Sequence, residues 1–542
     1  MTCNARLSAV SALVAIAAAS MCPIAHAASE SATYRAAYLA RFPNFNPSLT
    51  TDLPGDVDTA LKKRLEDAKK FPEVQRLFDL WSWQAFVTLN WPVNNQGRFA
   101  PKLRDTAFGP PKWTTWHEST SIFRQDGGIP TACGTAQAAQ LLSLTRETNL
   151  PVARDLKPFA MPADFDKRKT RLLGNISAVG DISPATPAST KRTHPEALDD
   201  ILQAFTAPLI DQNGNYVFYE IQMDPNEVGY VCTYKLYNIK GQVEFTGGNP
   251  ATKANLPSGT DRQDSSGSWE LKFAWRILTA SDDRQRFLTS AAIVPASNGK
   301  CPDQSAAEKD QCPVVVGLIG MHIAHKSTSS PQWIWSTFEQ VDNLAVDNVA
   351  HPTLKPSLFD PNCPICVPNQ PPAQQGDAWA TTPSTQAVRA IPIPADKVAL
   401  NEQASAALAT AGSALRYYQL IDSQWPTDPT APPANPTSGL PNAIENKPGG
   451  NPTPVYLTNM ALETYFQVGV QLACQQEEGQ TCPAGQWLTG SQKAVPTVDA
   501  TSVFGTESCM GCHSSAGLYI TPTKKSGQLK GDFSWLFSQK AH

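Results

Sequence analysis

The chain carries little charge and no long basic run. Among its 542 residues, 17% are Asp, Glu, Lys or Arg, and 44 basic residues against 48 acidic ones give a formal net charge of -4. A broad cationic surface for nucleic acid is therefore excluded. Methionine and histidine are also scarce, with 7 and 8 copies. Each of these side chains can be examined individually as a candidate ligand.

A long apolar run is missing as well. No segment approaches about 18 uninterrupted apolar residues, so the sequence predicts no transmembrane segment. The apolar run over residues 7–19 follows Arg6 and precedes the small-residue pattern Ala25-His26-Ala27. This arrangement is typical of a cleaved secretory signal. We expect residues 1–27 to be removed and the mature protein to be periplasmic or secreted.

Cysteine is abundant, with 12 copies. In an oxidising compartment thiols tend to pair. Three disulfides are expected, two because their cysteines are close in sequence within polar segments and the third by elimination: Cys301 with Cys312, Cys474 with Cys482, and Cys133 with Cys232. Cys363-Pro-Ile-Cys366 is either a small structural disulfide or a redox-active CxxC motif.

Apolar spacing indicates the fold class. Steps of three and four residues over 56–91 predict one helix followed by a second, largely buried one. Alternating or continuous apolar segments predict strands at 216–222, 230–238, 242–245, 268–278, 287–295, 313–326 and 333–341. Because helices come first and strands follow without regular alternation, we predict an α+β fold with N-terminal helices and a large, mainly antiparallel sheet.

Proline-rich stretches suggest how the chain is divided. We expect an α+β body over 28–350, then proline-rich arms and linkers with a short helical stretch over 351–455. A C-terminal helical segment is expected over 456–542. Within it, residues 457–472 regain helical spacing, and 531–537 form a short apolar helix capped by Asp532.

The most informative motif is Cys509-Met510-Gly511-Cys512-His513. CxxCH is the attachment signature of c-type haem, in which two thiols bond to the porphyrin vinyl groups and the histidine ligates iron. We predict one covalent haem c, bound through Cys509 and Cys512 with His513 as the proximal ligand. The segment 456–542 is then a cytochrome c-like haem segment.

Two other interpretations of this motif fit the sequence less well. A zinc site that adds Cys363 and Cys366 would need CxxC pairs much closer in sequence than these. A plain disulfide between Cys509 and Cys512 leaves the adjacent His513 unexplained.

The second axial ligand is not obvious, because no Met follows His513. The candidates left after the signal are Met161, Met223, Met321, Met460 and Met510, with His117, His194, His322, His325, His351 and His542. Met510 lies inside the attachment loop, which makes it unsuitable. The Trp113–Glu118 segment around His117 is typical of aromatic packing, and His542 is expected in a disordered terminus.

The segment 320–326 brings together Met321, His322 and His325 at the end of an apolar strand. In a strand Met321 and His325 share one face, about 13 Å apart, while His322 points to the other. Met321 and His325 therefore cannot both reach one iron. We consider either His322 or His325 as a distal iron ligand or haem-pocket base, against the alternative of a hydrogen-bonded core histidine.

Several of these motifs occur together in one known group. The motifs are residues 81–92 (WSWQAFVTLNWP), 320–326 (GMHIAHK), 333–342 (WIWSTFEQVD), 463–467 (ETYFQ) and 508–513 (SCMGCH). The chain resembles exported bacterial proteins labelled "cytochrome c family protein" over most of its mature length. The resemblance implies haem at Cys509, Cys512 and His513, and draws attention to His322 and His325. It names no substrate.

These observations favour an exported mono-haem protein that acts in electron transfer or as a haem oxidoreductase. The body that precedes the motif is far larger than an electron carrier needs. The expected partner is a periplasmic redox partner or a small-molecule substrate. A haem-based binding protein that senses redox state or a diatomic gas without turnover is the alternative, and a non-haem binding protein with a structural CxxC is a third reading.

Overall fold

The computed structural model describes the chain in several stretches. The described residues are 49–134, 170–173, 208–261, 267–296, 300–303, 305, 307, 311–346, 350–363, 366, 368–375, 378–389, 392–426, 457–466, 509–513, 516–526 and 529–542. The expected signal segment, the expected pair Cys474 and Cys482, and the candidates Met161 and His194 lie outside them.

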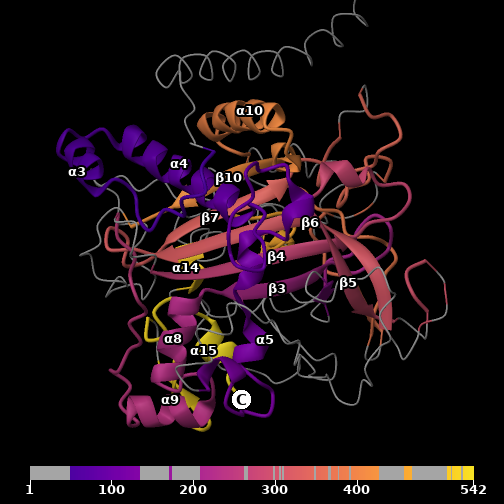
Figure 1. The fold of residues 1–542 in the computed structure, drawn as a ribbon. Coiled ribbons are helices and arrows are strands. Elements are labelled where there is room, and N and C mark those ends of the chain that lie inside the picture. The colour runs from indigo at the N-terminus through magenta and orange to yellow at the C-terminus, as the bar shows by residue number, and fades with distance from the viewer. Residues whose placement is uncertain are drawn as a thin grey trace, which may run out of the picture.

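A large sheet forms the centre of the molecule (Figure 1). Within the described residues it has eight strands: β1 (His117–Glu118), β2 (Thr170–Leu172), β3 (Phe218–Met223), β4 (Ser268–Ile277), β5 (Thr289–Pro295), β6 (Gln311–Lys326), β7 (Ile334–Gln340) and β10 (Tyr418–Gln424). The order β1-β3-β4-β6-β5-β2 runs through long β6, which also pairs with β7, and β7 pairs with β10. All pairings are antiparallel except that of β2 with β5.

Helices and small hairpins surround the sheet. The α-helices described are α3 (Thr59–Asp67), α4 (Phe71–Leu89), α5 (Ser119–Ile122), α8 (Pro225–Thr233), α9 (Ile239–Thr246), α10 (Ala395–Thr410), α14 (Cys509–His513) and α15 (Leu536–Gln539). Short 3-10 helices are η1 (Thr106–Phe108), η2 (Lys112–Thr115), η3 (Thr131–Cys133), η4 (Arg284–Arg286), η5 (Ala414–Tyr417) and η6 (Thr464–Phe466). Two hairpins join β8 (Gln374–Gln375) to β9 (Ala378–Trp379) and β11 (Tyr519–Thr521) to β12 (Lys524–Lys525). The predicted α+β class with a mainly antiparallel sheet is confirmed.

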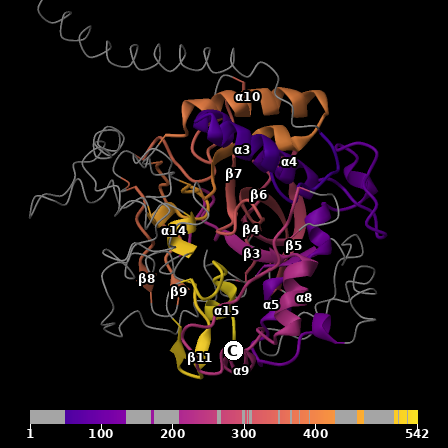
Figure 2. The same cartoon turned by 90° about the vertical axis from the view of Figure 1, so that its left-hand side faces the viewer.

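One face of the sheet, here the α4 face, carries the main core. Helices α4 and α10 lie over it (Figures 1 and 2). The Asp58 side chain caps α3, as is typical of a helix start. Phe86 of α4 stacks on Phe338 of β7 with ring centroids 4.2 Å apart. The two helices predicted over 56–91 are thus α3 and α4, and their apolar sides bury this face.

The opposite face, here the α14 face, is covered by α5, α8 and the C-terminal elements. Figure 2 shows α4 and α10 on one side of the sheet and α5, α8, α9 and α15 on the other. Met223, Ala324 and Trp335, from three strands, pack in one cluster with Met510 of α14 and Phe537 of α15. The C-terminal segment is therefore bound directly to the sheet.

Two strand predictions were wrong. Residues 230–238 lie in α8 and the turn after it, and 242–245 lie in α9. Asp224 caps α8 ahead of Pro225, and the Asn238 side chain caps α9. Because these helices start at proline and capping residues, local start signals outweighed the alternating apolar pattern.

The segment 351–455 contributes to the body as well as to loops. The predicted helical stretch is α10, and the next element, β10, pairs with β7 inside the main sheet. At 457–466 the described chain forms turns and η6, where an α-helix was predicted.

The C-terminus also differs from expectation. Helix α15 begins at Leu536 with Trp535 at the N-cap position, so Asp532, whose φ is 52°, lies too early in the chain to cap it. The last residue is ordered against α9, since the His542 carbonyl accepts a hydrogen bond from Ile239 N at 3.2 Å.

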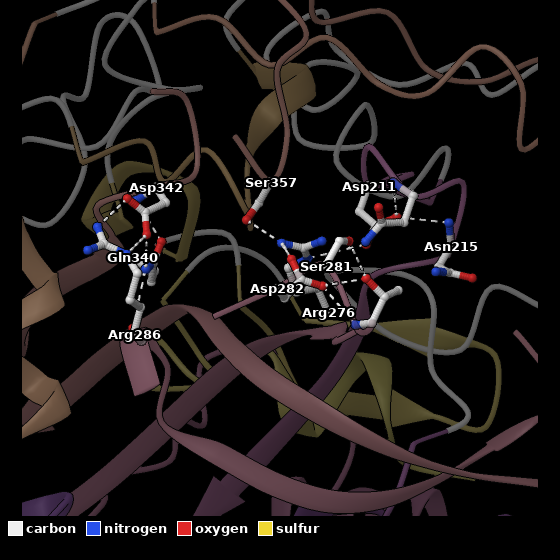
Figure 3. Close-up of polar contacts among 11 residues, drawn as sticks. Asp211, Asn215, Arg276, Ser281, Asp282, Arg286, Gln340, Asp342 and Ser357 are labelled. Carbon is white, nitrogen blue, oxygen red and sulfur yellow. Dashed lines mark hydrogen bonds and ion pairs between the residues drawn. The ribbon is translucent and has the colours of Figure 1, made fainter. Parts of the chain in front are cut away.

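Two buried arginines attach loops near the β5 side of the sheet (Figure 3). Arg286 makes two hydrogen bonds of 2.6 Å to the carboxylate of Asp342. Arg276 contacts Asp211 at 3.3 Å and Ser357 at 2.9 Å. These paired charges are satisfied by their own network, so they have a structural role.

Three disulfides join cysteines of the described chain. They are Cys133–Cys232, Cys301–Cys312 and Cys363–Cys366. The first two confirm the expected pairs, and the third resolves the CxxC alternative in favour of a bonded pair. No helix in the described ranges is long and apolar enough to cross a membrane.

Candidate functional site

The CxxCH turn lies on the α14 face. Met510 N donates a hydrogen bond to Oε1 of Gln424 on β10 at 2.9 Å. The Met510 side chain is buried in the cluster that includes Trp335. Cys509 is partly buried against the same cluster, whereas the Cys512 side chain lies outside the description. An apolar residue between the two cysteines thus fixes the turn to the sheet.

His513 is held with one ring nitrogen in use. Its Nδ1 lies 2.8 Å from the carbonyl of Phe533, and its ring centroid lies 4.4 Å from that of Trp335. Within the described residues, Nε2 makes no hydrogen bond. Since a carbonyl oxygen only accepts, Nδ1 carries the proton and Nε2 keeps a lone pair.

The surroundings keep this imidazole neutral. Burial lowers the pKa of His513 to about 3, and the charges of Lys272 and His322 act in the same direction, while the Phe533 carbonyl opposes them. A neutral imidazole with a free Nε2 is the form that ligates a metal.

The Phe533 carbonyl is fixed from β6. Lys326 Nζ lies 2.5 Å from Oδ2 of Asp532, which also accepts a hydrogen bond from Leu256 N at 2.7 Å. Burial raises the pKa of Asp532 to about 6, and Lys326 opposes that rise. The ion pair therefore positions Asp532. Asp532 precedes Phe533, whose carbonyl orients His513.

A histidine–carboxylate pair lies on the same face. Nε2 of His322 is 2.5 Å from Oε1 of Glu463, and the two side chains are 15% and 23% exposed. His322 lies directly opposite Lys272 on β4 and Thr337 on β7. The row of Glu270, Ala324 and Trp335 is the next one toward α14 on this face. The candidate site on this face therefore consists of Lys272, His322, Trp335, Glu463 and His513.

Glu463 is placed by a turn bound to the sheet. Asn459 donates from Nδ2 to Thr337 Oγ1 and to the Phe338 carbonyl, both at 2.9 Å. Asn459 N in turn donates to Oε2 of Glu463 at 2.9 Å. The turn lies so close to β6 that a Cβ on Gly320 would be 3.0 Å from the Cβ of Ala461.

His325 lies on the α4 face. It is fully buried, and its ring stacks on Trp269 at 3.8 Å and on Trp81 at 5.4 Å. Its two nitrogens face the carbonyls of Ser268 and Gly55 at 3.0 and 2.7 Å. The sheet separates His325 from His513, so His325 cannot reach an iron bound at His513 and is a core histidine.

The other candidates are distributed around the sheet. Met321 lies in the α4-face core, where its sulfur accepts a contact from Asn90 at 3.7 Å. Met223 and Met510 lie in the apolar cluster on the α14 face, and Met460 is fully buried in the turn that carries Glu463. Near His117, Trp113 and Trp116 are buried in the core, as aromatic packing predicts, and His351 contacts Arg286.

Sequence reasoning missed three members of this arrangement. Glu463 and Trp335 stood inside recognised motifs and Lys272 stood in a predicted strand. Trp335 was expected to be a core residue rather than an electron relay, and Glu463 and Lys272 had no expected role. Strand pairing and the returning turn bring them together, and a pattern along one strand carries no information about either.

The donor set fits haem c. Cys509, Cys512 and the neutral His513 lie on one helical turn. Nδ1 of His513 is hydrogen-bonded to a carbonyl, as the nitrogen that does not bind the metal typically is in metal-bound histidines. Among the described residues no three His, Cys, Asp or Glu side chains gather to hold a bare metal ion. The zinc alternative is removed because Cys363 is bonded to Cys366.

Comparison with known proteins adds no identity. The chain matches no protein-family model, no curated protein and no solved structure.

Proposed function

We propose that the chain is an exported c-type cytochrome with one haem attached through Cys509 and Cys512 and ligated by His513. The observation that carries the proposal is the state of His513 in a CxxCH turn. Its Nδ1 is committed to the Phe533 carbonyl, and its Nε2 has no hydrogen bond within the described residues. A covalent haem would use that lone pair and both thiols.

The chain's own groups then prepare the iron ligand. When bound, haem supplies an iron centre that exchanges one electron. The Phe533 carbonyl orients the His513 ring and raises its basicity as a ligand. Trp335 packs against the ring and limits its rotation.

Export to the periplasm or beyond is part of the proposal. It is supported by the signal pattern over 1–27 and by the three disulfides, which persist in oxidising compartments. C-type haem is attached to exported chains, so the location and the motif agree.

The proposed activity is electron transfer within a redox reaction, with turnover of a small molecule as the enzymatic form. The size of the body and the His322–Glu463 pair on the same face as His513 favour the enzymatic form over a simple carrier. A periplasmic redox partner would supply or remove electrons.

Attachment can be tested with a matched pair of variants. The protein is produced with a cytochrome maturation system, and covalent haem is detected on a denaturing gel. We expect C509A/C512A to lose the stain and C363A/C366A, which removes the other CxxC, to retain it. Staining that survives in C509A/C512A, or is absent from the wild type, would overturn the proposal.

A further inference from the structure

The His322–Glu463 pair has a feature that packing does not explain. Nδ1 of His322 is buried and has no hydrogen-bond partner among the described residues, although Nε2 is 2.5 Å from Glu463. A buried polar atom without a partner destabilises the fold, and such atoms are uncommon in folded proteins. This one lies on the face that carries the CxxCH turn.

The tautomer follows from the neighbours. A carboxylate only accepts hydrogen bonds, so Glu463 holds the proton on Nε2 and leaves Nδ1 with a lone pair. A histidine whose far nitrogen is held by a carboxylate is the arrangement of a general base. The same contact occupies Nε2, the less hindered of the two nitrogens for binding a haem iron.

We infer that His322, oriented by Glu463, is a general base for a small hydroperoxide bound next to the haem site. The inference depends on the proposed haem attachment and assigns the substrate class of that site. The groups from neighbouring elements near His322 are Lys272 on β4, Glu463 in the turn and His513 on α14.

The step is a proton transfer and needs no oxidant. The O–H bond of the hydroperoxide breaks, its electron pair stays on oxygen, and a new N–H bond forms at Nδ1 of His322. The carboxylate of Glu463 compensates the positive charge of the imidazolium, and Lys272 lies on the same face to attract the new anion. Later return of the proton restores the base.

Substrate chemistry distinguishes this role from gas sensing. Carbon monoxide and dioxygen carry no proton, so a base cannot accelerate their binding. Hydroperoxides and hydrogen cyanide must lose a proton when they bind as anions, and a positioned base accelerates that loss.

The test uses the haem-loaded protein and hydrogen cyanide as the probe, at a pH where the probe is protonated. Cyanide association with the ferric protein is followed by stopped-flow absorbance in the wild type, H322Q and E463Q. H351Q, which removes a histidine that contacts Arg286, is the matched control. Carbon monoxide binding to the reduced protein reports steric change.

The expected result separates the base from other roles. H322Q should slow cyanide association roughly 10²- to 10⁴-fold. E463Q should slow it roughly 10-fold or more, since it removes the group that orients the base. The resting absorbance spectrum, the carbon monoxide rate and the H351Q protein should stay like the wild type.

Two results would overturn the inference. A changed resting spin state in H322Q would make His322 an iron ligand, and a cyanide rate within twofold of the wild type would leave it without a base role. Failure of the haem proposal itself is distinct, because the wild-type protein would then carry no covalent pigment.

Discussion

Three histidines near the candidate site look alike in sequence and differ in chemistry because of what faces each ring. Within the described residues, His513 has one ring nitrogen on a carbonyl and the other without a hydrogen bond, His322 has a carboxylate partner, and His325 stacks on Trp269 with the Trp81 ring next to both. Strand alternation predicted that His322 and His325 point to opposite faces, which is confirmed. Which face receives the CxxCH turn was beyond that pattern, because it depends on where a segment almost 200 residues later returns to the sheet.

The buried ring of His325 gives acid sensitivity to the fold. Burial lowers the pKa of His325 from 6.5 to about 4, against the opposing effect of the Gly55 and Ser268 carbonyls. Between these pH values the unfolded chain binds more protons, so stability falls as pH falls from about 6.5 to 4. The full effect is on the order of 3 kcal/mol.

The variant H325Q should therefore show a flatter pH dependence. At pH 7 it should be less stable than the wild type, since the stacked ring is lost. The difference in unfolding free energy between the two proteins should shrink as pH approaches 4. Other titrating groups are common to both proteins and cancel. Urea unfolding at several pH values measures this, and a difference that stays constant with pH would contradict the assigned burial.

At the scale of elements, local signals predicted α3, α4 and the long strands, whose apolar periods extend over many residues. They failed at α8 and α9, where aromatic and valine residues resemble strands but Asp224 and Asn238 start helices. They also failed at 457–466, where helical spacing coincides with a turn held by side-chain hydrogen bonds. Short elements depend on capping and on tertiary contacts, which periodicity does not detect.

That turn supports the candidate base, and Asn459 is its main anchor. N459A removes bonds to Thr337 and Phe338, and a third in which Ala461 N donates to Asn459 Oδ1 at 2.8 Å. We expect a loss of about 2 kcal/mol or more in unfolding free energy. Cyanide association should slow in parallel, because Glu463 loses its position.

N459D is the matched comparison. It keeps an oxygen for Ala461 N but puts a second carboxylate oxygen against the Phe338 carbonyl in a fully buried position, so its stability should be no higher than that of N459A. Denaturant midpoints measure all three. Equal midpoints for the wild type and N459A would show that the turn is not held through this residue.

At the scale of the whole molecule, composition and order of elements were enough for the α+β class. The joining of distant parts was not predictable, since β10 enters the sheet from a proline-rich region and the C-terminal end packs under α8 and α9. The disulfide Cys301–Cys312 was accessible to sequence reasoning because its cysteines are close in sequence, and Cys133–Cys232 was accessible because few partners remained for either cysteine.

The Cys133–Cys232 bond should matter most for global stability. It closes a loop with a sequence separation of 99, for which the chain-entropy model gives about 4 to 5 kcal/mol. The C133S/C232S variant should lose a large part of that stability. C363S/C366S, whose separation is 3, should lose about 1–2 kcal/mol. Thermal and urea unfolding of both variants check this, and equal losses would contradict the entropic account.

The most direct measurement of the central claim is the mass of one peptide. Trypsin acting on protein matured in a haem-attaching host should release residues 494–524, which contain both thiols of the CxxCH motif. We predict that this peptide carries the added mass of one haem and absorbs in the Soret region. The same peptide at its unmodified mass, without pigment, would contradict the account.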